Sequence, residues 1–329
     1  MLGRLAMMFQ RKVQILSGLV LLLSLLFIGT FFFSPDTIAV REATGVLIDK
    51  QQSEKIIKID IQRPGLPEFT LIKRTGQWYA RRDTKEYPVK NERVADFLKP
   101  FSKPSVFPTR ASTLQAHERL GLSDTNAVRV RMWYDEHKEP TLDLYFGAMD
   151  AMGKEIYFRL ADQNEVKSAE DLFSSYLQSS PQSWYDLRLF PQSNGQSMTP
   201  ELVQKITWTV DNQGSFSILR SSTSQWSGLG NGLESKEIDT KKVDSFLRDL
   251  IGATGDDFTD PVQNTSDVSK VFITLELGDG RTKKVSILSD AATKTHVASV
   301  TDTPYTYLLS EWQYNQLIKD AAWFIKTAE

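Results

Sequence analysis

The sequence contains no cysteine among its 329 residues. This absence excludes disulfides, thiolate metal sites, cysteine nucleophiles and a lipid-modified N-terminal cysteine. The sequence also lacks a large excess of charge of one sign, because 39 basic and 41 acidic residues give a formal net charge of -2. Balanced charge argues against a nucleic-acid-binding role, which needs a strongly basic surface. The length suits two domains of ordinary size.

One long apolar run stands near the N-terminus. Residues 13–33 (VQILSGLVLLLSLLFIGTFFF) contain no charged residue. A helix of this length, at about 1.5 Å per residue, would cross a hydrocarbon core of about 30 Å. Basic residues precede the run, so the positive-inside rule places residues 1–12 in the cytoplasm and the chain after Pro35 outside. The run ends in three phenylalanines, which favours an uncleaved signal anchor over a cleaved signal peptide.

The chain after this run resembles itself. Segments that recur in the same order are residues 58–61 (KIDI) and 205–208 (KITW), 69–73 (FTLIK) and 216–220 (FSILR), and 87–98 (YPVKNERVADFL) and 236–247 (KEIDTKKVDSFL). One such match could arise by convergence, but the ordered series indicates a duplicated unit.

Each copy predicts the same order of elements. Period-two alternation predicts two strands, and a third short strand carries Trp78 or Trp226, which we expect in the core. A helix then begins near Asn91 or near Asp239, both good N-cap residues. The apolar face of this helix is predicted to contain Val94, Phe97 and Leu98 in the first copy and Val243, Phe246 and Leu247 in the second.

A second meander and a closing helix complete each copy. The closing helices are predicted to begin at Ser168 and at Ser310, because each hydroxyl precedes an acceptor by three residues, as in a capping box. The turn-rich segment 191–200 (PQSNGQSMTP) predicts a linker between the copies.

We therefore predict an α+β fold class, with an N-terminal transmembrane helix followed by two tandem repeats of a meander-helix-meander-helix unit. The predicted parts are a cytoplasmic N-terminus (1–12), a transmembrane signal anchor (13–33), a juxtamembrane segment (34–54), a first α+β repeat (55–190), a linker (191–200) and a second α+β repeat (201–329).

A catalytic site would need a nucleophile, a base or a metal set in convergent positions. The histidines His117, His137 and His296 lack an i, i+4 partner of metal-ligand type. Residues 147–155 (GAMDAMGKE) have one residue too many for a phosphate loop and predict a hairpin turn. Residues 228–232 (GLGNG) lead into a polar loop, which argues against a dinucleotide fingerprint.

Two charged groups receive a similar interpretation. Asp256, Asp257 and Asp260 lack the spacing of a calcium loop and predict a solvated loop. Arg81 and Arg82, with their tyrosine neighbours, fit a polar strand end as well as a basic-aromatic patch. We expect no catalytic, cofactor-binding or metal-binding residues, and no enzyme activity.

The ordered motifs resemble a known family. A strand pair, Trp78, Tyr-Pro-Val at residues 87–89, Val-x-x-Phe-Leu at 94–98 and Leu-Gly-Leu at 120–122 are similar to the family called domain of unknown function 4340. The resemblance covers nearly all of the chain after the apolar run. The second copy departs from the pattern, because Lys-Glu-Ile at 236–238 replaces Tyr-Pro-Val and the Gly-Leu pair is missing.

The resemblance implies a function. Members of this family are typically membrane-anchored and extracytoplasmic, and they often accompany the auxiliary subunit of gliding-motility-type ABC transporters. The implied role is a non-enzymatic extracytoplasmic accessory subunit of such a transporter assembly. The implied partners are the ABC permease and ATPase subunits and membrane lipid, and no nucleic acid is expected. Because the chain lacks a phosphate loop, the ATPase would be a separate subunit.

The implied location is the cell inner membrane, with a single pass, a cytoplasmic N-terminus and a periplasmic C-terminal domain. An alternative stays open from a different class, namely a cell-envelope scaffold or binding protein that holds protein or glycan without a transporter. An envelope hydrolase would need a carboxylate cluster or a triad, and the sequence offers no convincing one.

Overall fold

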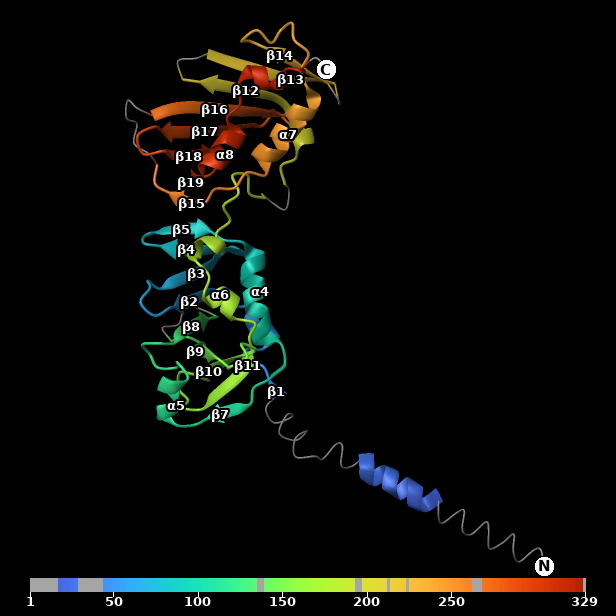
Figure 1. Ribbon diagram of the computed structural model, residues 1–329, viewed down its shortest axis with the longest axis vertical. Helices are drawn as coiled ribbons and strands as arrows, with labels where there is room; N and C mark the ends of the chain where they lie inside the picture. The colour runs from blue at the N-terminus through green and yellow to red at the C-terminus, as the bar shows by residue number, and fades with distance from the viewer. Residues whose placement is uncertain are drawn as a thin grey trace, which may run out of the picture. The chain divides into compact units, whose positions relative to one another are not determined.

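The computed structural model of the chain describes residues 17–28, 44–134, 139–192, 197–211, 214–222, 225–261 and 268–327 (Figure 1). These residues divide into two compact units. The first unit contains the described residues up to 73 together with 95–179, and the second contains 74–94 together with those from 180 onward.

The first sheet is antiparallel. Its strands follow in the order β5 (Lys85–Pro88), β4 (Gln77–Arg82), β3 (Phe69–Arg74), β2 (Lys58–Gln62), β8 (Val128–Trp133), β9 (Leu142–Met149), β10 (Glu155–Leu160), β11 (Val166–Glu170) and β7 (Thr109–Ala111). Strand β2 lies between β3 and β8. Asp60 of β2 is therefore opposite Thr70 of β3 on one side and Arg131 of β8 on the other. This register brings distant segments of the chain together on one face.

The second sheet is also antiparallel. Its strands follow in the order β14 (Gln225–Leu229), β13 (Gly214–Ser222), β12 (Val203–Val210), β16 (Val268–Leu277), β17 (Thr282–Asp290), β18 (Thr295–Val300), β19 (Thr306–Leu309) and β15 (Asp257–Thr259). Here β12 lies between β13 and β16, so Thr207 is opposite Ser217 of β13 and Thr274 of β16. The two sheets therefore place equivalent strands in the same order.

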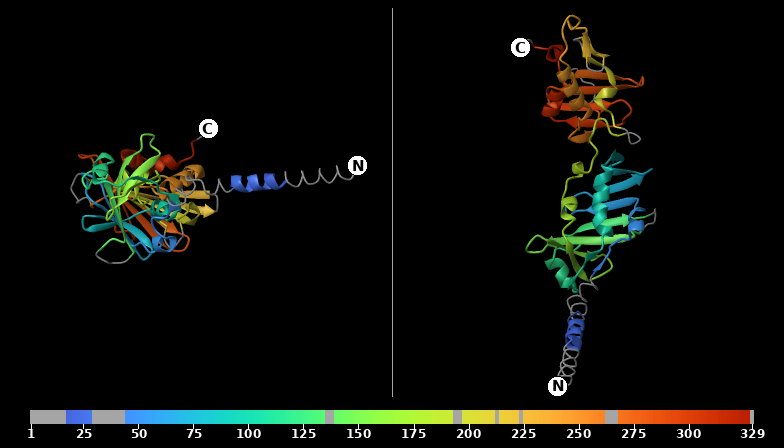
Figure 2. Two further views of the ribbon diagram at one scale, coloured as in Figure 1. Left: turned by 90° about the horizontal axis from the view of Figure 1, so that it is seen from below. Right: turned by 90° about the vertical axis from the view of Figure 1, so that its right-hand side faces the viewer.

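Helix α4 (Asn91–Ser102) covers one face of the first sheet (Figure 2, right). Strand alternation directs Ile59, Val130 and Leu144 to that face, and all three are 0% exposed. Phe97 and Phe101 of α4 are 0% exposed as well. The ring of Phe101 lies 4.9 Å, centroid to centroid, from the ring of Phe173, which precedes α6 (Ser174–Leu177). The predicted apolar face of this helix is confirmed.

Helix α7 (Thr240–Ile251) covers one face of the second sheet, with α8 (Glu311–Leu317) and the 3-10 turn η3 (Ala321–Phe324) nearby (Figure 1). Asp239 caps α7, accepting hydrogen bonds from two backbone amides of the first turn. Val243, Phe246 and Leu247 are 0% exposed, as predicted. The ring of Trp208 lies 5.1 Å from that of Phe246, so this helix and β12 share one core.

Shorter elements complete the described chain. They are β1 (Thr44–Gly45), α3 (Lys50–Ser53), β6 (Ser105–Val106), α5 (Leu114–Arg119), η1 (Pro181–Ser183) and η2 (Pro200–Leu202). Among them, α5 and the loop that follows it place Leu122, which is 0% exposed, against Tyr145 and Val166. This small second core covers part of the first sheet on the face away from α4.

The predicted fold class, an N-terminal transmembrane helix followed by meander-helix-meander-helix repeats, is wrong. The described chain is mostly antiparallel sheet, because the two predicted meanders of each copy hydrogen-bond into one continuous ladder. Ser168 does not begin a closing helix either. It lies in β11 opposite Tyr157, and its hydroxyl accepts a hydrogen bond from Arg110 Nε at 2.9 Å. The Ser168 hydroxyl, which the capping-box pattern assigned to a helix N-terminus, is instead hydrogen-bonded within the sheet.

The predicted transmembrane helix also needs correction. Within the residues that the structure describes, no helix is long and apolar enough to cross a membrane. Residues 17–28, the described part of the predicted span, are helical. The rest of the predicted span, residues 13–16 and 29–33, lies outside the described residues.

Candidate binding surfaces and cleft

A buried carboxylate lies on the open face of the first sheet, the face away from α4. Asp60 is 2% exposed and accepts a hydrogen bond from Thr70 Oγ1 at 2.8 Å. The ammonium of Lys58 lies 2.8 Å from Asp60 Oδ2, and Arg131 Nη2 lies 3.8 Å from the same oxygen. A buried charge is tolerated when it is paired and hydrogen-bonded. The hydrogen bond and the two ionic contacts with Asp60 hold the side chains of Thr70, Lys58 and Arg131 in defined positions.

Arg129 forms a second ion pair on the same face, with Asp143. Arg129 donates two hydrogen bonds to Asp143, at 2.9 and 2.6 Å. The hydrogen bonding with Asp143 raises the pKa of Arg129 above its ordinary value. The ring of Tyr145 lies beneath, with the guanidinium carbon of Arg129 at 5.1 Å and that of Arg159 at 4.1 Å from the ring centroid. Bidentate and cation–π contacts together restrict these side chains to defined positions.

The ring of Trp133 likewise makes cation–π contacts with two basic side chains. The ammonium of Lys58 lies 4.1 Å from its ring centroid, and the guanidinium carbon of Arg131 lies 5.8 Å away. Arg131 also pairs with Glu68. The aromatic rings are therefore the inner layer of this open face, and the paired cationic groups are the outer layer. We call this surface, defined by Lys58, Asp60, Arg129, Arg131 and Asp143, the charged face.

The open face of the second sheet has a different chemistry. Thr207 and Ser217 share a hydrogen bond at 2.9 Å, at the sheet positions that correspond to Asp60 and Thr70. Further hydroxyl residues on this face of the strands include Thr209, Ser215, Thr274, Ser286, Ser299 and Thr306. Lys205 pairs with Glu276 at 2.8 Å. We call this surface the hydroxyl face.

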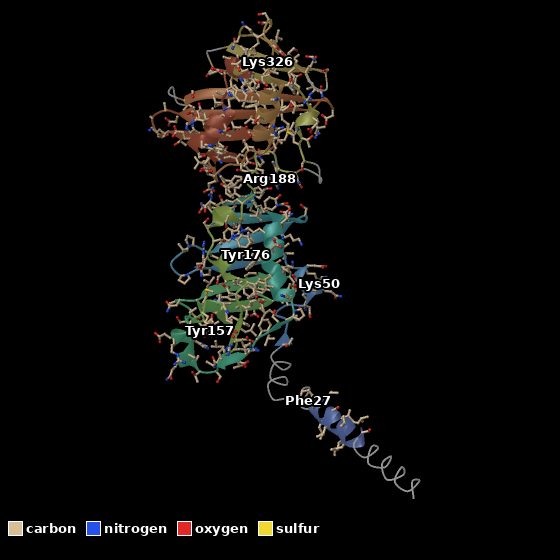
Figure 3. The ribbon with its side chains drawn as sticks, turned by 45° about the vertical axis from the view of Figure 1, so that its right-hand side comes forward. Phe27, Lys50, Tyr157, Tyr176, Arg188 and Lys326 are labelled. Atoms are coloured by element: carbon tan, nitrogen blue, oxygen red, sulfur yellow. The ribbon has the colours of Figure 1, made fainter. Side chains whose placement is uncertain are left out.

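A cleft of about 680 Å³ opens within the second unit, which includes residues 74–94. Asp186 lies in it and is 7% exposed. Arg188 (labelled in Figure 3) donates to both carboxylate oxygens of Asp186, at 2.7 and 2.6 Å, and this hydrogen bonding raises the pKa of Arg188. Tyr79 and Tyr305 line the cleft and are each partly buried. Its volume falls in the range of small-ligand sites.

Comparison with known proteins gives a family. The family model described as Domain of unknown function (DUF4340) matches residues 78–270. The chain belongs to this family. A search of curated proteins and a search of solved structures find no match to the chain. The family description carries no activity, so any function of this DUF4340 chain has to be argued from its surfaces.

The structure places two of the three histidines. His117 lies on α5, where Nε2 is 2.8 Å from the Asn164 carbonyl oxygen. His296 lies on β18, stacked on Tyr314 with ring centroids 4.0 Å apart, and its Nδ1 lies 2.8 Å from Ser289 Oγ. His137 lies outside the described residues. Sequence reasoning missed the Ser289–His296 pair, because their contact depends on the register of β17 with β18.

The acidic residues near 256–260 pair with cations of the same unit. The predicted solvated loop is wrong for Asp257, which lies in β15 opposite Leu308. Asp257 Oδ1 lies 3.0 Å from Arg82 Nη1, and Asp260 pairs with Lys85. Arg82 also donates to the Phe258 carbonyl oxygen at 2.6 Å. Among the residues described, no group of three or more histidine, aspartate and glutamate side chains could hold a metal ion. Arg82 therefore acts here as a structural tie within the second unit.

The remaining motifs have structural positions. Trp78 and Trp226 are each 6% exposed, which confirms the expectation of core residues. Residues 147–155 form the β9–β10 hairpin, as predicted, and Asp150 Oδ1 accepts hydrogen bonds from the amides of Lys154 and Glu155. These hydrogen bonds lower the pKa of Asp150. Residues 228–232 end β14 and continue as a turn.

Sequence reasoning also missed the charged face. Its signal was present, because charged residues alternate with apolar ones in KIDI at 58–61 and in VRVRMW at 128–133. Alternation places those charges on one face of each strand. That the two strands are neighbours is a long-range pairing, and the local pattern does not contain it.

Proposed function

We propose that this chain is a non-enzymatic, extracytoplasmic accessory subunit of a membrane ABC transporter assembly of the gliding-motility type. In this role the charged face of the first sheet contacts the extracytoplasmic surface of a permease subunit. The ATPase is a separate chain on the cytoplasmic side. The partners proposed are thus the permease and ATPase subunits, with membrane lipid around the N-terminal segment.

The charged face is the observation that carries the proposal. Arginine, tyrosine and tryptophan are enriched in protein interfaces and in their energetic hot spots. Arg129 is already held by Asp143, and Arg131 by Glu68. Prior ordering lowers the conformational entropy that a side chain loses on binding, so such a face is suited to specific recognition of a protein surface.

The proposed location rests on the N-terminal segment. Basic residues precede an uncharged run at 13–33, which favours a cytoplasmic N-terminus and an extracytoplasmic remainder. In the described part of this run the apolar side chains are exposed, and Phe27 (labelled in Figure 3) is 74% exposed. Exposed apolar surface of this kind suits contact with lipid. We propose attachment to the inner membrane through this run.

An envelope scaffold or binding protein without a transporter is the second candidate. The cleft around Asp186 and Arg188 favours it, because a site for a small ligand needs no transporter partner. Genes for division or wall synthesis beside this gene, in place of transporter genes, would favour this candidate.

Purification from native membranes tests the first proposal. The full chain, tagged after Glu329, is captured in a mild detergent and the co-eluting proteins are identified by mass spectrometry. We expect an ABC permease and its ATPase in amounts close to that of the chain. Their consistent absence, while other membrane complexes survive the same detergent, would contradict the transporter role.

A further inference from the structure

The cleft of the second unit has aromatic side chains on two of its walls. Tyr79 belongs to β4, and Tyr305 lies in the loop that precedes β19. Both side chains line the cleft and are partly buried, and burial raises the pKa of Tyr305. Tyrosine offers an apolar ring face together with a hydroxyl that donates and accepts hydrogen bonds.

An ion pair lies in the lining of the cleft. The Arg188 guanidinium donates two hydrogen bonds to the Asp186 carboxylate, and the Arg188 backbone amide donates a third to Oδ1 at 3.4 Å. The carboxylate is buried, while about two-fifths of the arginine side chain (39%) stays exposed. Tyr307 also lines the cleft, and its burial raises its pKa to about 12. In this pair the carboxylate retains lone pairs and the guanidinium retains N–H groups beyond the bonds they share.

The charges of the cleft are mostly neutralised internally. Arg188 pairs with Asp186, and Asp302 pairs with Lys283 at 2.8 Å. Glu92, in the first turn of α4, acts electrostatically on Arg188. An anionic ligand would meet three carboxylates and one guanidinium at the lining. A cationic ligand would have to compete with Arg188 and Lys283 for their partners. A neutral ligand rich in hydroxyl groups meets neither obstacle.

We propose that this cleft binds a neutral carbohydrate chain. The apolar face of a sugar ring packs against the ring of Tyr305 or Tyr79, while neighbouring hydroxyls bridge the free donors of Arg188 and the free acceptors of Asp186. The site combines aromatic faces with a few fixed polar groups, as ligand sites with directional specificity do. This proposal is independent of the transporter role, because it concerns only residues of the second unit.

The test measures binding of soluble probes to the full chain in mild detergent. The probes are the tetramer of N-acetylglucosamine, the tetramer of glucose joined as maltotetraose, and a tetrapeptide of lysine as the cationic comparison. Titration calorimetry is the readout. We expect saturable binding of at least one sugar and none of the peptide. Binding of the peptide alone would replace the proposal with a cationic peptide site, and binding of none of the probes would overturn it.

Variants assign the binding to the cleft. We expect Tyr305→Ala to weaken sugar binding about tenfold or more, as for loss of an aromatic hot spot. Arg188→Gln should weaken it as well. Tyr157→Ala, which removes a partly buried tyrosine of the first unit, is the matched control and should bind like the parent. Melting temperatures show that each variant is folded. A folded Tyr305→Ala variant with unchanged sugar affinity contradicts the proposal.

Discussion

The open faces of the two sheets use the same positions for different chemistry. On the first sheet, Asp60 accepts from Thr70 at 2.8 Å. On the second sheet, Thr207 and Ser217 share a hydrogen bond at 2.9 Å at the corresponding positions. The arrangement of the pair is retained, while a buried carboxylate with cationic partners is replaced by two hydroxyl groups.

The covered faces do not differ in this way. Phe97 on α4 and Phe246 on α7 are both 0% exposed, and each helix packs on a sheet whose inner residues are apolar. Core positions tolerate few changes, since volume and polarity are both constrained. The open faces combine buried groups such as Asp60 with partly exposed ones such as Arg129, so they can accommodate more varied side chains. The charged face and the hydroxyl face thus carry different side chains on a common framework.

The largest loss of stability should come from substitutions in the helix-covered core, which has the same construction in both sheets. Phe97→Asp and Phe246→Asp should each lower the free energy of unfolding by at least about 4 kcal/mol, because each removes a buried ring and leaves an unpaired buried carboxylate. Urea unfolding of the full chain measures this. Ala95→Asp, at an exposed position of α4, should cost less than about 1 kcal/mol. Similar melts for Phe97→Asp and the parent would show that the covered face is misassigned.

An intermediate loss of stability should distinguish the charged face from the hydroxyl face. Asp60→Ala removes a charged acceptor from Thr70 and from Lys58, and we expect it to cost about 2–3 kcal/mol. Thr207→Ala removes only a hydroxyl-to-hydroxyl bond, and we expect about 0.5–1.5 kcal/mol. Peptide-resolved hydrogen exchange assigns each loss to its own sheet. Equal losses for both variants would mean that the charge of Asp60 adds nothing.

The smallest effect should be a difference in salt sensitivity. Raising the salt from about 20 mM to about 500 mM screens the partly exposed pairs of the charged face. Amide exchange in β2 and β8 should then speed up about twofold relative to β12 and β16, because exposed pairs contribute only a fraction of a kcal/mol. An identical response of the two sheets would remove the electrostatic distinction between them.

Local patterns predicted the elements better than their arrangement. The helices near Asn91 and Asp239 lie where predicted, because period-3.6 burial is a local signal. Asp239 is the N-cap as predicted, whereas Asn91 is the first helical residue and its Oδ1 accepts from the Trp78 amide at 2.9 Å. Ser310 forms the predicted capping box with Gln313, whereas Ser168 lies in a strand. The same local pattern thus gave two outcomes, and long-range strand pairing decided between them.

The cleft was beyond sequence reasoning for the same reason. Its polar floor comes from residues 186–188, while its aromatic walls come from Tyr79 and Tyr305. Segments separated by more than a hundred positions meet there only through the folded structure. None of them carries a motif with a known chemical role, and their hydrophobic pattern is that of ordinary strand and loop residues. The family match shows which family the chain belongs to but gives no activity. The proposed functions therefore depend on the charged face and the cleft.

Affinity capture of three full-length chains tests the central claim, that the charged face is the docking surface for the transporter. The parent, Arg131→Ala and Thr274→Ala are expressed at equal levels and captured from native membranes, with folding checked by melting temperature. The two substitutions lie at corresponding positions of the first and second sheets. We predict that Arg131→Ala lowers the recovered permease about fivefold or more, as for loss of an arginine hot spot, and that Thr274→Ala recovers as much as the parent. Equal recovery with Arg131→Ala and the parent, or no ABC subunit with any of the three chains, would contradict the account.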